Sequence, residues 1–170
     1  MNKLKEKNYI DITKEWLNKP KSKKYKVKEQ LYFDYNHKRY HVDNKNVILD
    51  YNKKELEIAK WLVKIFGGKI YMLPRINKPD GIKTPDYLWN NEYWDLKEIK
   101  SSGTRAVDNR INGTKSQTSN YILDFSKNVL TNKEIVKKVA NIYNSPERNW
   151  VNKIIIIKDN KLLKVLKRKD

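Results

Sequence analysis

Apolar residues recur at helical spacing in two segments of the chain. Residues 53–66 are apolar around most of the helix circumference, which predicts a helix of the core. A second helix is predicted after Thr131, because apolar residues follow at intervals of three and four and Thr131 with Glu134 matches a capping box. A short third helix is expected within residues 10–17.

Short apolar runs bounded by Gly, Pro, Asn or Asp predict the strands. They fall at residues 26–35, 38–42, 46–49, 69–73, 87–89, 93–96, 121–125, 154–157 and 162–165. The first two runs are expected to form a hairpin. Residues 20–24 read as a charged linker and residues 74–83 as a loop. The order of helices and strands predicts an α/β layered domain.

Residues 84–97 can fold as a tight hairpin. The Asn-Asn pair at 90–91 is able to take the positive φ angles of a two-residue type I′ turn. In that register Asp86 faces Asp95, with Cβ atoms about 4.5–5.5 Å apart, and Lys97 shares their face. The opposite face is predicted to pack on the core and holds Tyr87, Trp89, Trp94 and Leu96.

Two opposed carboxylates in a sheet repel each other, so such a pair points into bulk water, shares a proton or holds a cation. With no histidine or cysteine nearby, carboxylate oxygens suit Mg²⁺ or Mn²⁺. A lysine two residues further on can orient or help to deprotonate the attacking water. The alternative is a solvated Asp-Lys surface hairpin without a metal ion.

Glu55 is the acid that the first long helix aims inward. The apolar face of that helix runs through Ala59 and Leu62, and one turn back along the same face lies Glu55. An inward carboxylate needs a partner, which a metal site or Lys97 would supply. The structural alternative is that Asn52 caps the helix and Glu55 occupies the third position of a capping box.

The order of these motifs resembles the PD-(D/E)XK nuclease superfamily. Residues 46–125 together resemble the tRNA-nuclease toxin domain of contact-dependent growth inhibition proteins, and similar domains end some phage head-morphogenesis proteins. The motifs that carry the resemblance are Glu55 four residues before Ala59, Phe66-Gly67-Gly68, Leu73-Pro74, Thr84-Pro85-Asp86-Tyr87, Asp95-Leu96-Lys97, Gln117 and Ile122-Leu123-Asp124.

The resemblance implies a restriction-endonuclease-like α/β fold, with a mixed central sheet flanked by helices. Residues 46–170 would form the nuclease domain, and residues 1–45 a basic N-terminal extension with a hairpin. The chain departs from the family pattern in two ways. Eight residues separate Asp86 from Asp95, and the basic N-terminal region lies outside the match.

In the site that the resemblance implies, Asp86 and Asp95 hold Mg²⁺ or Mn²⁺ and Lys97 is the catalytic lysine. Glu55 and Gln117 complete the pocket. The implied activity is metal-dependent hydrolysis of phosphodiester bonds, with tRNA favoured over DNA. As a toxin domain the protein would act in the cytoplasm of a target cell, and a cognate immunity protein with an acidic surface is expected.

Composition agrees with a nucleic-acid partner. Lys and Arg total 38 against 20 acids, so the net charge is +18, which favours a polyanion through counterion release. Arg105, Arg110 and Lys115 follow the candidate catalytic strand and are candidate phosphate contacts, although they are equally compatible with a solvated basic loop. The absence of cysteine excludes disulfides, zinc fingers and thiol catalysis. No apolar run approaches the length of a membrane span, so no membrane partner is expected.

Three other functions stay open on the sequence. The first is a DNA endonuclease of the same fold. The second is a metal-free ribonuclease that uses the two histidines, His37 and His41, as acid and base. The third is a basic nucleic-acid-binding module without catalytic activity, in which the acid cluster has a structural role.

Overall fold

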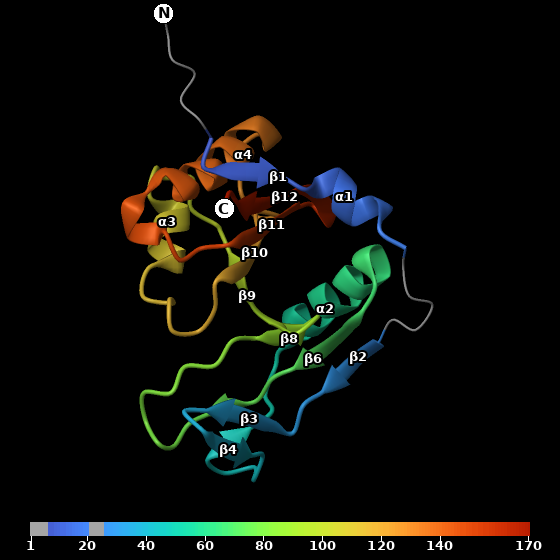
Figure 1. Ribbon diagram of the computed structural model, residues 1–170, viewed down its shortest axis with the longest axis vertical. Coiled ribbons are helices and arrows are strands. Elements are labelled where there is room, and N and C mark those ends of the chain that lie inside the picture. The colour runs from blue at the N-terminus through green and yellow to red at the C-terminus, as the bar shows by residue number, and fades with distance from the viewer. Residues whose placement is uncertain (1–6, 21–25) are drawn as a thin grey trace, which may run out of the picture. The chain divides into compact units, whose positions relative to one another are not determined.

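The computed structural model describes residues 7–20 and 26–170, which form two compact units (Figure 1). The first unit comprises the N-terminal residues up to Trp16, Leu96–Lys115 and Ser119–Asp170. The second unit comprises Leu17–Asp95 and Ser116–Thr118. Segments far apart in the sequence thus build each unit. The division into residues 1–45 and 46–170 stays a prediction.

The sheet of the first unit has the strand order β1 (Tyr9–Asp11), β12 (Lys161–Arg168), β11 (Lys153–Lys158) and β10 (Asn120–Asp124). Strands β10 and β11 are parallel, whereas β12 runs antiparallel to β11 and to β1. Its helices are α3 (Ala106–Ile111), α4 (Asn132–Ala140) and the 3-10 helices η1 (Asn141–Asn144) and η2 (Pro146–Arg148), and the short helix α1 (Thr13–Asn18) contains the unit boundary after Trp16.

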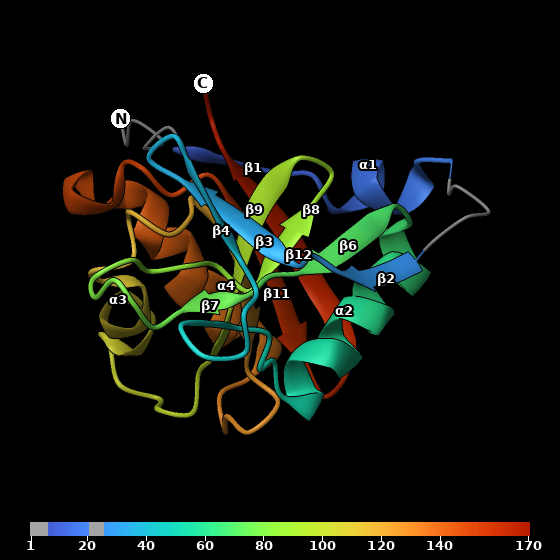
Figure 2. The ribbon, with the colours of Figure 1, turned by 90° about the horizontal axis from the view of Figure 1, so that it is seen from below.

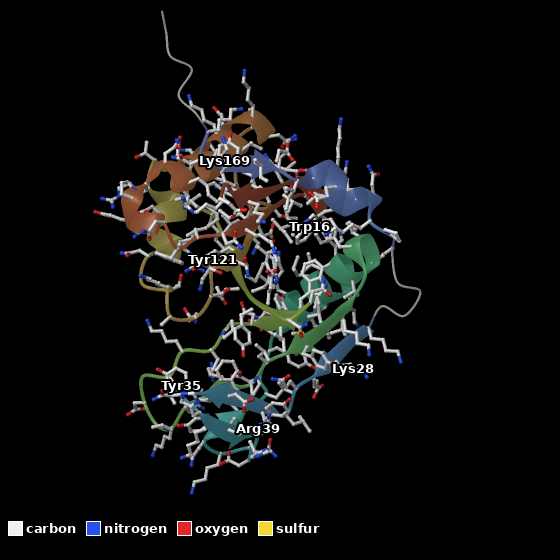
Figure 3. The ribbon with its side chains drawn as sticks, viewed as in Figure 1. Trp16, Lys28, Tyr35, Arg39, Tyr121 and Lys169 are labelled. Carbon is white, nitrogen blue, oxygen red and sulfur yellow. The ribbon has the colours of Figure 1, made fainter. Side chains whose placement is uncertain are left out.

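The core of the first unit forms around the parallel pair β10 and β11. Tyr121, labelled in Figure 3, is fully buried together with Ile154 and Ile156, and α4 contributes Ile135 and Val139 to the same cluster. The run Ile154–Ile157 is buried throughout, as predicted for a central strand that is covered on both faces.

The second unit packs helix α2 (Lys53–Phe66) on strands β2 (Lys26–Glu29) and β6 (Lys69–Met72), which lie side by side in Figure 2. Strand β8 (Tyr87–Trp89) is antiparallel to β6 and to β9 (Glu92–Glu98), and β9 continues into the first unit. Two small sheets complete the unit: β3 (Tyr32–Tyr35) with β4 (Lys38–His41), and β5 (Val47–Ile48) with β7 (Arg75–Ile76).

Tight turns without glycine join three antiparallel strand pairs. Asn90-Asn91, Asn36-His37 and Asp159-Asn160 each have positive φ angles at both residues, as type I′ turns require. Asn and Asp tolerate this conformation better than other residues with a side chain. The predicted turn at residues 90–91 is therefore confirmed.

Side-chain caps define where the two long helices begin. Asn52 Oδ1 accepts a hydrogen bond of 2.8 Å from the Glu55 backbone N–H at the start of α2. At the start of α4, Thr131 and Glu134 form both hydrogen bonds of a capping box. Both caps were predicted from sequence, because a cap depends on residues three positions apart.

Three predictions are wrong in detail. Residues 26–29 form a strand that pairs in parallel with β6 instead of extending the hairpin. Residues 10–17 are divided between β1 and α1, and Arg75–Ile76 within the predicted loop pairs with β5. In each case the partner strand is distant in sequence, so a local pattern could not reveal it. The predicted linker lies, apart from Pro20, outside the described residues.

The α/β class is confirmed, since helices and mixed strands alternate along the chain. Its restriction-endonuclease-like character stays a prediction. Within residues 7–20 and 26–170, no helix has the length and apolarity needed to cross a membrane.

Candidate active site

The hairpin that carries the candidate carboxylates has the predicted register. Tyr87 pairs with Trp94, and Leu88 pairs with Tyr93. Tyr87, Trp89 and Trp94 are fully buried, and the Trp89 indole N–H donates to the Gly67 carbonyl at 3.1 Å. Truncating either tryptophan to alanine would cost about 3–5 kcal/mol. The core thereby holds the hairpin, in which Asp86 directly precedes Tyr87 and Asp95 directly follows Trp94.

Asp95 is buried, with 2% of its surface exposed. The alternative of a solvated surface hairpin is therefore wrong for this residue, and both faces of β9 are covered at Trp94 and Asp95. The charge of Asp95 is close enough to raise the pKa of Glu55 and of Tyr87. The predicted pairing of Asp86 with Asp95 lies just beyond the last paired position, Tyr87 with Trp94.

A cavity of about 410 Å³ in the second unit collects several of the predicted site residues. Three acids line it, namely Asp50, Glu55 and Asp86. Its other polar and charged side chains include Gln117, Arg75, Lys83 and Thr84. Glu55, Asp86 and Gln117, which are widely separated in the sequence, thus share one cavity.

Glu55 is both a cap partner and a lining residue of this cavity. Burial raises the pKa of its carboxyl above the ordinary value near 4.5, and the charges of Asp50 and Asp95 raise it further. The Asn52 backbone N–H and the Arg75 guanidinium act in the opposite direction. The two sequence interpretations of Glu55 are therefore compatible. A partly buried carboxyl with a raised pKa is suited to exchange protons.

Tyr87 holds the start of α2 in place. Its hydroxyl donates to the Glu55 backbone carbonyl at 2.6 Å, and burial raises the pKa of this phenol well above its ordinary value. The hydroxyl therefore stays protonated and keeps its role as a donor. Glu55 is thus positioned by the Asn52 cap and by the β8 strand.

Gln117 reaches the cavity from a segment that is remote in sequence. Its Nε2 donates to the Thr84 carbonyl at 3.2 Å, and the adjacent Thr118 hydroxyl donates to the Tyr93 carbonyl at 2.6 Å. These bonds attach residues 116–118 to the hairpin. With its nitrogen engaged by Thr84, Gln117 can offer its amide oxygen to a water or a cation.

Lys97 follows Asp95 by two positions on β9, so the two side chains leave the strand on the same side. It is partly buried. This agrees with the alternation expected from the sequence. Its role as the catalytic lysine stays a prediction.

The oxygen donors of the cavity fit a hard divalent cation. No three His, Cys, Asp or Glu side chains come together as a metal cage within the described ranges 7–20 and 26–170. Mg²⁺ needs no such cage, because it usually keeps several waters and is bound through one or two carboxylates and substrate phosphates. Asp86 and Glu55 line the cavity and are compatible with that mode, whereas Asp95 and Lys97 are not among its lining residues.

Sequence reasoning missed Arg75 and its partner Asp50. Arg75 Nη2 lies 2.5 Å from Asp50 Oδ2, and Arg75 Nε donates to Asn77 Oδ1 at 3.2 Å. The ion pair stays partly exposed, with 59% of the Arg75 side chain accessible. A guanidinium held at the rim of an acid-lined cavity can bind a phosphate in two-point fashion. The only sequence signal is the position of Arg75 one residue after the Leu73-Pro74 motif.

The predicted phosphate contacts lie in the first unit. Arg105 and Arg110 line a cavity of about 690 Å³ there, whereas Lys115 is not among its lining residues. All three are exposed, and Arg105 forms an ion pair of 3.2 Å with Asp108. Both arginines are accessible to a polyanion.

His37 and His41 lie on the β3–β4 hairpin. His37 is in the turn with a φ angle of 64°, and His41 is on β4, with its ring centroid 6.3 Å from that of Tyr32. Both histidines are exposed, and neither lines the acid cavity.

A family model, the contact-dependent growth inhibition CdiA C-terminal domain, matches residues 83–162. The chain is similar to toxin domains of contact-dependent growth inhibition. The matched span contains Asp86, Asp95, Lys97 and Gln117, whereas Glu55 precedes it.

A chain of the CdiA-CT/CdiI toxin and immunity complex from Burkholderia pseudomallei has a similar fold. The TM-score is 0.50 at 20% sequence identity, and the match covers 67% of this chain and 82% of that chain. At this identity the likeness concerns the fold. A search of curated protein sequences found no match.

Proposed function

We propose that the protein is a metal-dependent nuclease that hydrolyses phosphodiester bonds of tRNA as a toxin domain. The observation that carries the proposal is the clustering of Asp50, Glu55 and Asp86 around one cavity in a chain of net charge +18. Carboxylates that share a cavity repel one another, and a bound cation would relieve that repulsion and attract a phosphate.

Asp86 and Asp95 are the residues that would hold Mg²⁺ or Mn²⁺, with the Leu96 carbonyl as a further oxygen ligand. When bound, such an ion supplies positive charge that polarises the scissile phosphate and lowers the pKa of a coordinated water. The buried position of Asp95 restricts its rotamers, which favours a preorganised ligand.

The other side chains have separate tasks. Glu55, whose pKa is raised, accepts the proton of the attacking water, and Lys97 positions the resulting hydroxide. Gln117 orients the water through its amide oxygen. Arg75 binds the non-bridging phosphate oxygens, because its guanidinium is held at the cavity rim by Asp50.

Several observations support a nucleic-acid target inside a recipient cell, and tRNA is the target that the family resemblance favours. The similarity to contact-dependent growth inhibition toxins supports action on a target inside a recipient cell. Arg105, Arg110 and Lys115 are exposed and available to the phosphate backbone. A cognate immunity protein is the expected protein partner, in keeping with the toxin and immunity complex of similar fold.

The test is incubation of the purified chain with total tRNA and with plasmid DNA, in Mg²⁺ and in EDTA, read on a denaturing gel. Asp95→Ala and Asp86→Asn run beside it. Asp80→Asn is the matched control, because this exposed acid of the same region does not line the cavity. We expect metal-dependent tRNA fragments with the unmodified chain and Asp80→Asn, and none with the two site variants.

Other outcomes would overturn the proposal in distinguishable ways. Cleavage of plasmid DNA alone would establish the DNA endonuclease of the same fold. Cleavage that survives EDTA and disappears in His41→Ala would establish the metal-free ribonuclease. Tight, salt-sensitive binding of nucleic acid without any cleavage product would instead support a non-catalytic binding module.

A further inference from the structure

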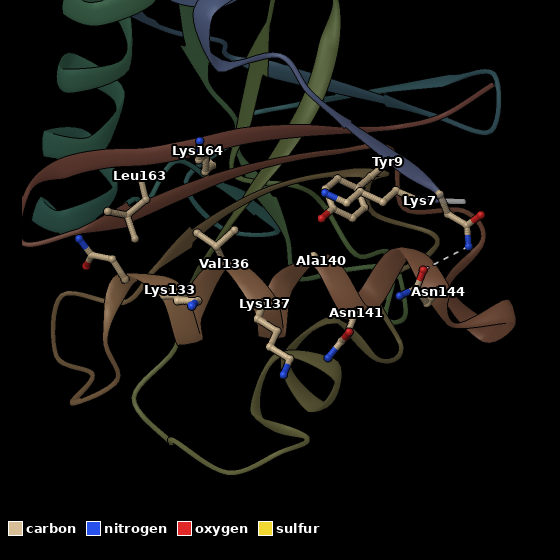
Figure 4. Close-up of a pocket in the computed structure, with 12 residues that line it drawn as sticks. Lys7, Tyr9, Lys133, Val136, Lys137, Ala140, Asn141, Asn144, Leu163 and Lys164 are labelled. Atoms are coloured by element: carbon tan, nitrogen blue, oxygen red, sulfur yellow. Dashed lines mark hydrogen bonds between the residues drawn. The ribbon is translucent and has the colours of Figure 1, made fainter. Parts of the chain in front are cut away.

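A groove of about 1040 Å³ runs along helix α4 in the first unit (Figure 4). Its described lining residues are four lysines, four asparagines, three aliphatic residues and a tyrosine, with no acid among them. They are Lys7, Lys133, Lys137, Lys164, Asn8, Asn132, Asn141, Asn144, Val136, Ala140, Leu163 and Tyr9. The groove combines an apolar floor with a basic rim.

The floor is a continuation of the core. Val136 and Leu163 are partly buried and pack against the main hydrophobic cluster of the first unit, and so does Tyr9. Figure 4 shows Val136 rising from α4 toward Leu163 on β12. Because core residues support these side chains, the floor has a fixed shape. Partly buried aliphatic groups gain stability when a partner removes them from water.

An irregularity in β12 shapes this groove. Ile156 pairs with Lys164 and Ile157 pairs with Leu162, so Leu163 is the extra residue of a bulge. Consecutive strand residues normally point to opposite faces, whereas both Leu163 and Lys164 line the groove. A bulge redirects side chains in this way. It places an apolar and a basic residue side by side.

The rim carries positive charge along one side of α4. Lys133 and Lys137 are exposed and lie one helical turn apart. Lys164 Nζ forms an ion pair of 2.9 Å with Asp11, which fixes its position. Asn8 donates to Asn144 at 3.2 Å across one end of the groove. Charged and amide groups therefore surround the apolar floor.

The chemistry of the groove favours a peptide over a nucleic acid. The Tyr9 ring stacks on Tyr143, with 5.6 Å between centroids, and Lys7 Nζ lies 5.8 Å from its centroid. Tyr9 is the aromatic residue among the described lining residues, and these contacts already engage its ring, which disfavours base stacking there. The aliphatic side chains of the floor cannot form hydrogen bonds with the edge of a nucleic-acid base. They do fit leucine or phenylalanine side chains of a partner.

We propose that the α4 groove docks an acidic amphipathic helical segment of a partner protein. Apolar residues at i, i+3 and i+4 would cover Val136, Ala140 and Leu163, as in other helix-in-groove complexes. Carboxylates on the flanks would face Lys133 and Lys137. The docking does not depend on the nuclease reaction, so either proposal can fail without the other.

The test uses the full chain and a fluorescein-labelled helical peptide of leucines and glutamates, with the leucines at i, i+3 and i+4 spacing. A scrambled peptide of equal composition keeps the charge and removes the apolar stripe. Binding is measured by fluorescence anisotropy at about 150 mM salt, where long-range attraction between exposed charges is screened. We expect at least tenfold tighter binding of the amphipathic peptide.

Two double variants distinguish an effect of the groove on peptide binding from an effect of the protein's net charge. Lys133→Glu/Lys137→Glu reverses the rim, and Lys60→Glu/Lys64→Glu makes the same change on two exposed lysines one turn apart on α2. We expect the first to weaken binding at least tenfold and the second less than about threefold. A third variant, Leu163→Ala, should weaken the amphipathic peptide and leave the scrambled peptide unchanged. Circular dichroism checks the fold of each.

Four results would overturn the proposal. One is an equal loss of affinity in both double variants, and another is equal binding of the scrambled peptide. Methyl NMR provides the third: shifts at Val136 and Ala140 with a tRNA fragment and none with the peptide would assign the groove to nucleic acid. The fourth is self-association in solution that disappears in Lys133→Glu/Lys137→Glu, which would make a second copy the occupant.

Discussion

The Glu55–Asp86 cavity and the α4 groove belong to one strongly basic chain but gather opposite charges. Asp50, Glu55 and Asp86 line the cavity together with Arg75 and Lys83. The lining of the groove contains four lysines and none of the acids in the described part of the chain. Composition alone would predict basic surfaces everywhere. The departure from that expectation is what marks the cavity as a chemical site.

The two regions also differ in how their charges are balanced. In the cavity, Asp50 and Asp95 raise the pKa of Glu55, and Arg75 opposes them. Acidic and basic groups thus shift the pKa of Glu55 in opposite directions, and carboxyls perturbed in this way are common at catalytic sites. In the groove, like charges surround an apolar floor, which is the pattern of a docking surface. Chemistry is therefore expected in the first region and recognition in the second.

The largest expected difference between the regions is in cleavage. Asp86→Asn should lower the rate of tRNA cleavage by at least about 10²- to 10³-fold, because it removes a charged ligand at the reacting phosphate. Lys133→Glu/Lys137→Glu in the groove should change the rate at saturating tRNA by less than about twofold. Single-turnover kinetics measure both. Equal losses of cleavage rate in the two variants would contradict the assignment of catalysis to the cavity and not to the groove.

A smaller effect is expected at the cavity rim. Arg75→Gln should lower kcat/KM about 10- to 100-fold, mainly through KM, since a charge-assisted hydrogen bond to phosphate contributes about 1.5–3 kcal/mol. Arg39→Gln is the control, because Arg39 is likewise exposed and paired with an acid, Asp34, at 2.8 Å. The steady-state kinetics of the control should match those of the unmodified chain. If both variants lost activity alike, Arg75 would have no special role.

Loss of a side-chain cap is expected to cost about 1 kcal/mol of stability at the start of either long helix. Asn52→Ala and Thr131→Ala remove the side-chain caps of α2 and α4, and each should lower the free energy of unfolding by about that amount. Asn52→Ala should also slow cleavage, because its cap bond goes to the backbone of Glu55. Urea denaturation and cleavage assays test this. A loss of activity in Thr131→Ala would contradict the separation.

The smallest effect concerns the protonation of Glu55. Its pKa is raised in the folded protein, so the fold favours the neutral carboxyl and the stability from this group declines as pH rises from about 4.5 through the raised value. Glu55→Gln should therefore be slightly more stable than the unmodified chain at pH 7 and lose this pH dependence, while cleavage falls. Thermal unfolding against pH measures it. Lower stability at pH 7 would show that the ionised carboxyl stabilises the fold.

The elements that depend on near neighbours were predictable. The helix at residues 53–66 and the register of Tyr87 with Trp94 were predicted as observed, because helical periodicity and the Asn90-Asn91 turn are local signals. The parallel pairing of β2 with β6 was missed. Parallel strands need a long crossover, so no contiguous motif reveals them.

The candidate site divides in the same way. Glu55, Asp86 and Gln117 were selected from motifs, and they line one cavity. Arg75 and Asp50 were not selected, because their ion pair depends on the antiparallel pairing of β5 with β7. A paired strand of two residues has too little pattern to be recognised in sequence.

The sequence by itself determined the net charge, the helix caps and the turn that aligns β8 with β9, because each depends on composition or on residues a few positions apart. Only the tertiary structure decided which carboxylates share a cavity with Arg75 and which lysines border an apolar groove. Those choices follow from strand pairing and from the bulge at Leu163. Both are set by burial of the whole core, which no single segment contains.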